Sequence, residues 1–167
     1  MVKLQEINQE LKEMEHLVMQ INYFCHASTD TRYITILVKN LAHKILEYLK
    51  IESKDIQHLL RHEKKHHHYK IYTTTHKSKH LHRQFEHEKE NIKKNVQKII
   101  HACQKRKDNK ITRKSFLDKI NQSCSFILKT LESEHHELDL IKKMISHQKK
   151  VIGVRRKITE KHFKSKK

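Results

Sequence analysis

Apolar residues recur at alternating spacings of three and four along the first part of the chain, and this pattern restricts the fold more than any other sequence feature. The run begins at Leu4 and reaches Cys25 without a missed position. An apolar repeat of about 3.5 residues places one stripe along an α-helix and is typical of coiled coils and helical bundles. Residues 2–27 are therefore predicted to form an amphipathic helix that buries its stripe against other helices.

Three later stretches carry the same kind of stripe. They predict helices over residues 31–68, 78–107 and 112–151. The second pattern weakens around Ser53, where a kink is expected, and residues 69–78 are the predicted long turn. Turns rich in Ser, Thr, Asp and Asn connect helices without glycine, and short turns make successive helices antiparallel. The predicted fold class is all-α, an up-and-down antiparallel four-helix bundle with coiled-coil-like heptads.

The chain has no proline and a single glycine, Gly153. Sheets depend on tight turns that use these two residues, so a β-rich fold is excluded. Gly153 is expected to stop the fourth helix, because glycine is the usual residue just beyond a helix C-terminus. The predicted organisation is a bundle over residues 1–152 followed by a basic, flexible tail over residues 153–167.

The formal net charge of +18 predicts an acidic partner. Much of the charge lies near the C-terminus, where the predicted polyanion-binding residues are Lys149, Lys150, Arg155, Arg156, Lys157, Lys161 and Lys164. Lysine and arginine neutralise phosphates, but only Phe163 in this tail offers an aromatic ring for base stacking. The partner classes left open are an acidic protein, nonspecific nucleic acid and an anionic membrane surface.

Catalytic and targeting motifs are missing from the sequence. No glycine-rich phosphate loop is present, and Cys25, Cys103 and Cys124 occupy apolar seam positions where thiols are inert. The N-terminal residues include acidic side chains and no apolar run, so they do not resemble a signal peptide. No apolar run in the sequence is long enough for a transmembrane helix. These features predict a non-enzymatic, cytoplasmic protein with no cofactor.

Histidines and two glutamates suggest an alternative, metal-binding or pH-responsive function. Nine of the 17 histidines lie between His58 and His87, and Glu88 and Glu134 each replace an apolar seam residue. Counting outward from the predicted turns places these groups at one end of the bundle. Imidazole and carboxylate bind Zn²⁺ or Fe²⁺, so the candidate metal ligands are His58, His62, Glu88, Glu134 and His135.

Several histidine and glutamate positions partly match the ligand pattern of hemerythrin-like bundles. His43 and Glu47 resemble the His-x-x-x-Glu pair of that family, His62 and His66 resemble its His-x-x-x-His pair, and His16 resembles its first-helix ligand. At 100° per residue, however, His43 and Glu47 lie opposite the apolar face of their helix. Ferritin-like spacing is matched only by Glu132 and His135. Both resemblances therefore concern architecture only.

The sequence favours a helical-bundle interaction protein that binds an acidic partner through its basic surface and tail. The alternative is a histidine- and glutamate-based metal-binding or pH-responsive bundle. A third interpretation is a homo-oligomer or adaptor, since long heptad helices often bury their seams between chains.

Overall fold

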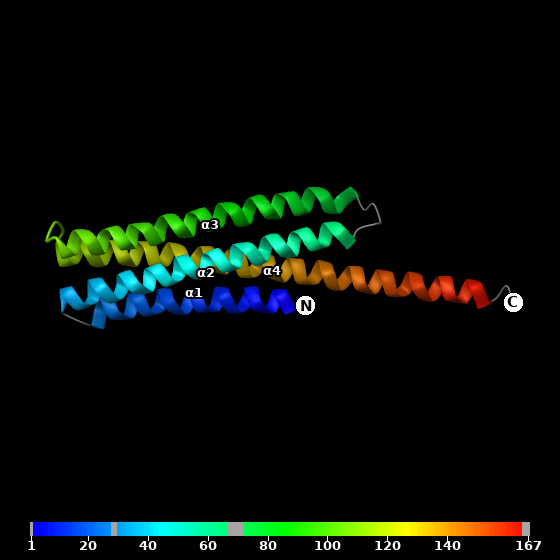
Figure 1. The fold of residues 1–167 in the computed structure, drawn as a ribbon, viewed down its shortest axis with the longest axis horizontal. Helices are drawn as coiled ribbons and strands as arrows, with labels where there is room; N and C mark the ends of the chain where they lie inside the picture. The colour runs from blue at the N-terminus through cyan, green and yellow to red at the C-terminus, as the bar shows by residue number, and fades with distance from the viewer. Residues whose placement is uncertain (1, 28–29, 67–71, 165–167) are drawn as a thin grey trace. The chain divides into compact units, whose positions relative to one another are not determined.

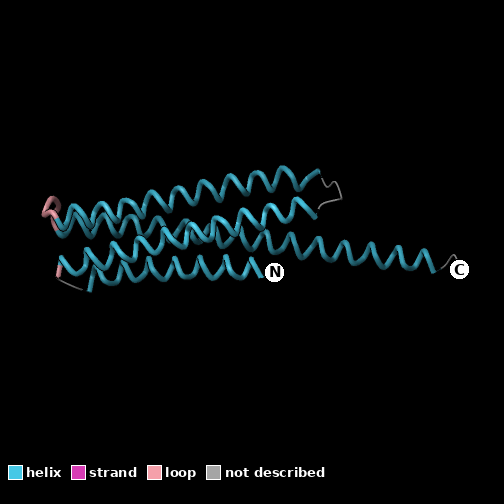
Figure 2. The backbone as a smooth tube through the Cα atoms, viewed as in Figure 1, coloured by secondary structure: helices cyan, strands magenta, loops and turns pink. Residues whose placement is uncertain are grey.

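The computed structural model describes residues 2–27, 30–66 and 72–164, and these are helical except at the turns (Figures 1 and 2). The four helices are α1 (Val2–Ala27), α2 (Thr31–His66), α3 (Tyr72–Lys107) and α4 (Arg113–Lys164). They form two compact units, Met1–His135 and His136–Lys167. The described part of the second unit is α4 from residue 136 to its end.

The first unit confirms the predicted all-α bundle, in which successive helices run in opposite directions (Figure 1). Helix α2 packs against both α1 and α3. Ser133 on α4 contacts Glu88 on α3, and Asn121 on α4 contacts His26 on α1, so the four helices surround one core. Large apolar side chains exposed by less than 2% fill this core: Ile7, Leu11, Met14, Ile21, Ile45, Ile92, Ile99, Ile120, Ile127 and Leu131.

Local hydrogen bonds fix the helix ends near the turns. Asp30 Oδ1 accepts hydrogen bonds from the backbone N–H groups of Arg32 and Tyr33 at 3.0 and 3.1 Å, which caps α2. Asn109 has a φ of 57°, a left-handed conformation that asparagine tolerates, and Lys110 N–H donates to Lys105 O at 2.8 Å. Together these bonds end α3 as the turn residues predicted.

Two helix ends differ from the sequence prediction. The prediction that α4 ends near residue 151 is wrong, because α4 continues through Gly153 to Lys164. Glycine within a helix costs only about 1 kcal/mol relative to alanine, and no proline follows to prevent continuation. Helix α3 begins at Tyr72 and not near residue 78, since threonines at 73–75 disfavour a long helix only weakly. The remainder of the predicted turn, up to residue 71, lies outside the described residues.

Helix α2 runs without interruption past Ser53 to His66. Within the described ranges, none of the helices has an apolar stretch of the length and hydropathy that crossing a bilayer requires. The predicted separation of a flexible tail at residue 152 stays a prediction.

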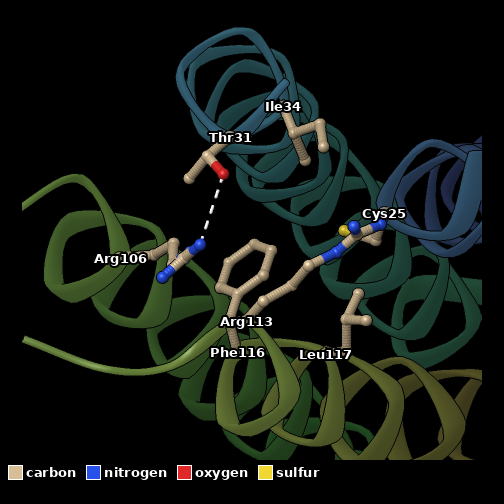
Figure 3. Close-up of a pocket in the computed structure, with 7 residues that line it drawn as sticks. All are labelled: Cys25, Thr31, Ile34, Arg106, Arg113, Phe116 and Leu117. Carbon is tan, nitrogen blue, oxygen red and sulfur yellow. Dashed lines mark hydrogen bonds between the residues drawn. The ribbon is translucent and has the colours of Figure 1, made fainter. Parts of the chain in front are cut away.

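A small cavity lies near the turns that join α1 to α2 and α3 to α4 (Figure 3). Arg106 on α3 links the turn before α4 to the start of α2. Its Nη1 donates to Ile111 O at 2.9 Å, and its Nη2 donates to Thr31 Oγ1 at 3.3 Å. The Phe116 ring lies between Arg106 and Arg113 in the close-up. A volume of about 10 Å³ holds at most one water, so this cavity is a feature of packing and not a ligand site.

Candidate functional site

Three helices of the first unit bury a glutamate where their apolar seams call for an apolar residue. Glu52 follows Ile45 and Leu49 on α2, and only 1% of its surface is exposed. Glu88 on α3 is 7% exposed and Glu134 on α4 is 1% exposed. Carboxylates are rarely buried to this extent in proteins, because an ionised group loses its hydration on entering the core. We call these residues the seam glutamates.

The seam glutamates belong to one polar layer of the bundle. Ser133, which precedes Glu134, donates a hydrogen bond from Oγ to Glu88 Oε1 at 2.8 Å. Lys89, which follows Glu88, donates from Nζ to Ser53 Oγ at 2.9 Å, and Ser53 follows Glu52. Glu10 on α1 interacts electrostatically with Glu52 and has its Oε2 buried. Each of the four helices therefore contributes one carboxyl group to this layer.

The environment of Glu52 strongly favours its protonated form. Burial makes the largest contribution, and together with the nearby charges of Glu10, Glu88 and Glu86 it raises the pKa of Glu52 to about 8. Lys89 opposes this shift but does not cancel it. Within the described residues, Glu52 Oε1 is buried and accepts no hydrogen bond. Glu52 is therefore a proton-binding group in the core near neutral pH.

The structure brings together only part of the predicted metal set. Glu88 lies beside the α4 segment that carries Glu134, because Ser133 donates a hydrogen bond to Glu88. His135 instead turns to α1, where its Nε2 lies 3.1 Å from Glu15 Oε1 and its Nδ1 lies 3.1 Å from Asn8 Oδ1. The side chains of His58 and His62 lie outside the described part of the structure.

No metal centre is formed by the side chains that the structure describes. Among them, no three His, Cys, Asp or Glu side chains are placed to hold a metal ion together. His43 and Glu47 are exposed, as the helical-wheel argument predicts for these hemerythrin-like positions, and His16 is exposed as well. The candidate Zn²⁺ or Fe²⁺ site remains a prediction for the complete set that includes His58 and His62.

Positive charge is concentrated on one helical hairpin of the first unit. Residues 91–131 carry eleven Lys and Arg against two Asp, whereas residues 1–57 carry seven basic and eight acidic residues. The first stretch covers the second half of α3, the turn and the first part of α4. The formal charge of this first unit therefore lies mainly on α3 and α4, while α1 and the first half of α2 are nearly neutral.

Lysines from both helices of this hairpin border a recess. Its lining residues are Lys98, His101, Ala102, Lys105, Lys119, Gln122 and Ser123, and its volume is about 300 Å³. Ala102 and Ser123 are buried small residues at the boundary between α3 and α4. Because short side chains leave this boundary unfilled, longer lysine side chains stand around an open space. We call this space the α3–α4 recess.

Sequence reasoning missed Glu52, Glu10 and the α3–α4 recess. Glu52 has a detectable signal, since it stands at a seam position between Leu49 and Ile56. Glu10 lies beside its seam and has no such signal. The recess follows from the small residues Ala102 and Ser123 facing one another, which requires the pairing of α3 with α4. The side chains of the predicted tail residues, from Lys149 to Lys164, lie outside the described part of the structure.

Comparisons with known proteins leave function to be inferred from these residues. No protein-family model, no curated protein and no solved structure matches the chain.

Proposed function

We propose that this chain is a non-enzymatic helical bundle that binds an acidic macromolecule through the exposed surface of α3 and α4, with the basic C-terminal residues adding to the attraction. The observation that carries the proposal is the uneven charge distribution. Residues 91–131 have an excess of nine positive charges, whereas residues 1–57 have an excess of one negative charge. A surface of one sign attracts oppositely charged partners and orients them during encounter.

The arrangement of lysines supports a binding surface and not only a solvated exterior. Lys94, Lys98 and Lys105 follow one another along α3 at helical spacings that keep them on one side. Lys119 on α4 borders the same recess as Lys98 and Lys105. Like charges on one side of a helix repel one another and lower the stability of the isolated bundle. An acidic partner relieves this repulsion, which favours its binding.

Charge reversal at the recess tests this proposal. The variant Lys98→Glu/Lys105→Glu/Lys119→Glu is compared with Lys44→Glu/Lys50→Glu/Lys54→Glu, which makes the same charge change at exposed positions of α2. The probes are heparin, polyglutamate and an oligonucleotide, and affinity is measured by fluorescence anisotropy at low and high salt. The proposal expects the recess variant to lose most of its affinity and the α2 variant to keep it. Equal losses, or binding that is independent of salt, would contradict the proposal.

A second candidate function is a pH-responsive bundle, favoured by the burial of Glu52, Glu88 and Glu134. A core that contains several carboxyl groups is stable only when some of them bind protons or cations. Glu52 binds a proton near neutral pH, because its pKa is raised to about 8. Thermal unfolding followed at several pH values tests this candidate, and unfolding that does not depend on pH rules it out.

Metal analysis of the purified, untagged protein tests the metal-binding form of the alternative function. A stoichiometric metal that is lost in Glu134→Ala would support a metal-binding bundle. No bound metal, together with unchanged melting in the presence of a chelator, would rule it out.

A further inference from the structure

The α3–α4 recess combines charge with neutral hydrogen-bonding groups in a concave space. Lys98 and Lys105 come from α3, and Lys119 comes from α4, so cationic groups approach from two sides. Gln122 and Ser123 add an amide and a hydroxyl to the same lining. An ammonium group binds phosphate as a point charge, and hydroxyl and amide donors complete the coordination of phosphate oxygens. The recess therefore has the chemistry of a phosphate-binding subsite.

An exposed aromatic ring continues this surface along α4. Phe126 follows Gln122 by one helical turn, so both side chains project from the same side of the helix. Phe126 is 49% exposed, so its ring is accessible to a partner. The other large apolar residues of the first unit that the structure describes as exposed lie on α1 and α2: Met19, Tyr23, Tyr33, Ile36 and Ile51. Among the described residues 91–131, Phe126 is thus the exposed large apolar side chain, and the same stretch is rich in lysine and arginine.

We infer that the α3–α4 recess binds a phosphate of single-stranded nucleic acid, and that Phe126 stacks on a base of the same strand. This inference rests on the proposed function and specifies its partner. Proteins that bind single strands without sequence preference combine a basic groove for the backbone with aromatic side chains for the bases. A single strand exposes its bases for stacking, whereas a duplex keeps them paired and enclosed.

The same features fit other acidic partners less well. An anionic membrane is flat and is best bound by several apolar side chains beside lysines, but Phe126 has no exposed apolar neighbour on the described part of the hairpin. An acidic peptide supplies carboxylates and gives Phe126 no partner for stacking. A single nucleic acid strand supplies a phosphate for the recess and a base for stacking on Phe126, because phosphates and bases alternate along it.

The experiment separates the contribution of the ring from that of the charges. Affinities are measured by fluorescence anisotropy for an oligothymidylate of about 20 nucleotides, a duplex of equal length and polyphosphate, which has no bases. The variants are Phe126→Ala, Lys98→Glu/Lys119→Glu and the control Tyr33→Ala, which removes an exposed aromatic ring from α2. Circular dichroism confirms that each variant keeps its helical fold.

The expected result is that Phe126→Ala weakens oligothymidylate binding at least about fivefold and leaves polyphosphate binding unchanged. Lys98→Glu/Lys119→Glu weakens the binding of both probes, and Tyr33→Ala weakens neither. If Phe126→Ala leaves oligothymidylate binding unchanged, or if the duplex binds as tightly, the inference is overturned while the proposed function stands. Binding to phosphatidylserine vesicles without oligothymidylate binding also overturns it. If neither oligothymidylate nor polyphosphate binds at low salt, the proposed function fails as well.

Discussion

Ser133 on α4 donates a hydrogen bond from its Oγ to Glu88 Oε1 on α3, with a distance of 2.8 Å between the two oxygens. Glu88 stands at a seam position and is 7% exposed, so this bond forms almost out of contact with solvent. A hydroxyl that donates to a buried carboxyl group lowers the cost of its burial. The contact also aligns α4 with α3, because a shift of one helical turn would separate the two groups.

We predict that Ser133→Ala lowers the free energy of unfolding by about 1–2 kcal/mol, because Glu88 loses a donor that water does not replace in the core. Urea denaturation measures the change. Ser125→Ala, at an exposed position of the same helix, is the matched control and is expected to have almost no effect. In a Glu88→Gln background the cost of Ser133→Ala should become smaller. A cost that stays the same in that background would show that the bond contributes nothing to stability.

Glu52 makes the stability of the bundle depend on pH. Its pKa is raised from about 4.5 to about 8 in the folded chain. Between these pH values the folded state keeps a proton that the unfolded state has released, so stability falls as pH rises. We predict that the free energy of unfolding decreases from pH 5 to pH 8 by an amount on the order of a few kcal/mol.

The variant Glu52→Gln tests the origin of this dependence. Glutamine has nearly the same shape and no ionisation, so the decrease between pH 5 and pH 8 should be largely absent in thermal or urea unfolding. Glu47→Gln, at an exposed position of the same helix, should keep the decrease. A stability profile of Glu52→Gln that still falls like that of the unmodified chain would assign the effect to other groups.

The apolar repeat made most of the fold predictable. A stripe such as Ile7, Leu11 and Met14 has to be buried, and the structure buries all three. Asp30 and Asn109 lie at helix ends, as the sequence predicts. The Asp30 side chain accepts a backbone hydrogen bond at the start of α2, and Asn109 adopts the left-handed conformation after α3. Gly153 misled the prediction because a glycine only weakens a helix, and whether it ends one depends on the residues that follow.

The candidate site was harder to predict because it depends on the register between helices. In antiparallel neighbours, an error in the position of the turn shifts the paired residue by twice that amount. Placing the turn near residue 73 aligns Glu88 with His58, whereas the structure places Lys89 against Ser53 and Glu88 near Glu52. Glu88 and Glu134 were found because each interrupts a seam. The α3–α4 recess was not found, because a run of sequence does not show which small residues will face each other.

The three cysteines are predicted to be unreactive in the folded protein. Cys25, Cys103 and Cys124 are buried free thiols, and burial raises the pKa of each to about 12. At pH 8 this lowers the reactive thiolate fraction by about three orders of magnitude relative to an ordinary thiol, before access is considered. A thiol reagent such as 5,5′-dithiobis(2-nitrobenzoate) should react rapidly only in denaturant. The exposed thiol of Ser125→Cys provides the positive control in the native state.

Salt dependence should reveal which lysines contact phosphates. Each phosphate that a lysine neutralises on a single strand contributes roughly 0.7 to the slope of the logarithm of the binding constant against the logarithm of salt concentration. Under the inferred binding of a single strand we predict that Lys119→Gln reduces this slope by about that amount, because Lys119 borders the α3–α4 recess. Lys50→Gln removes the same charge from an exposed position of α2 and should leave the slope unchanged. If both variants reduce the slope equally, the attraction arises from net charge spread over the molecule and not from contacts at this recess.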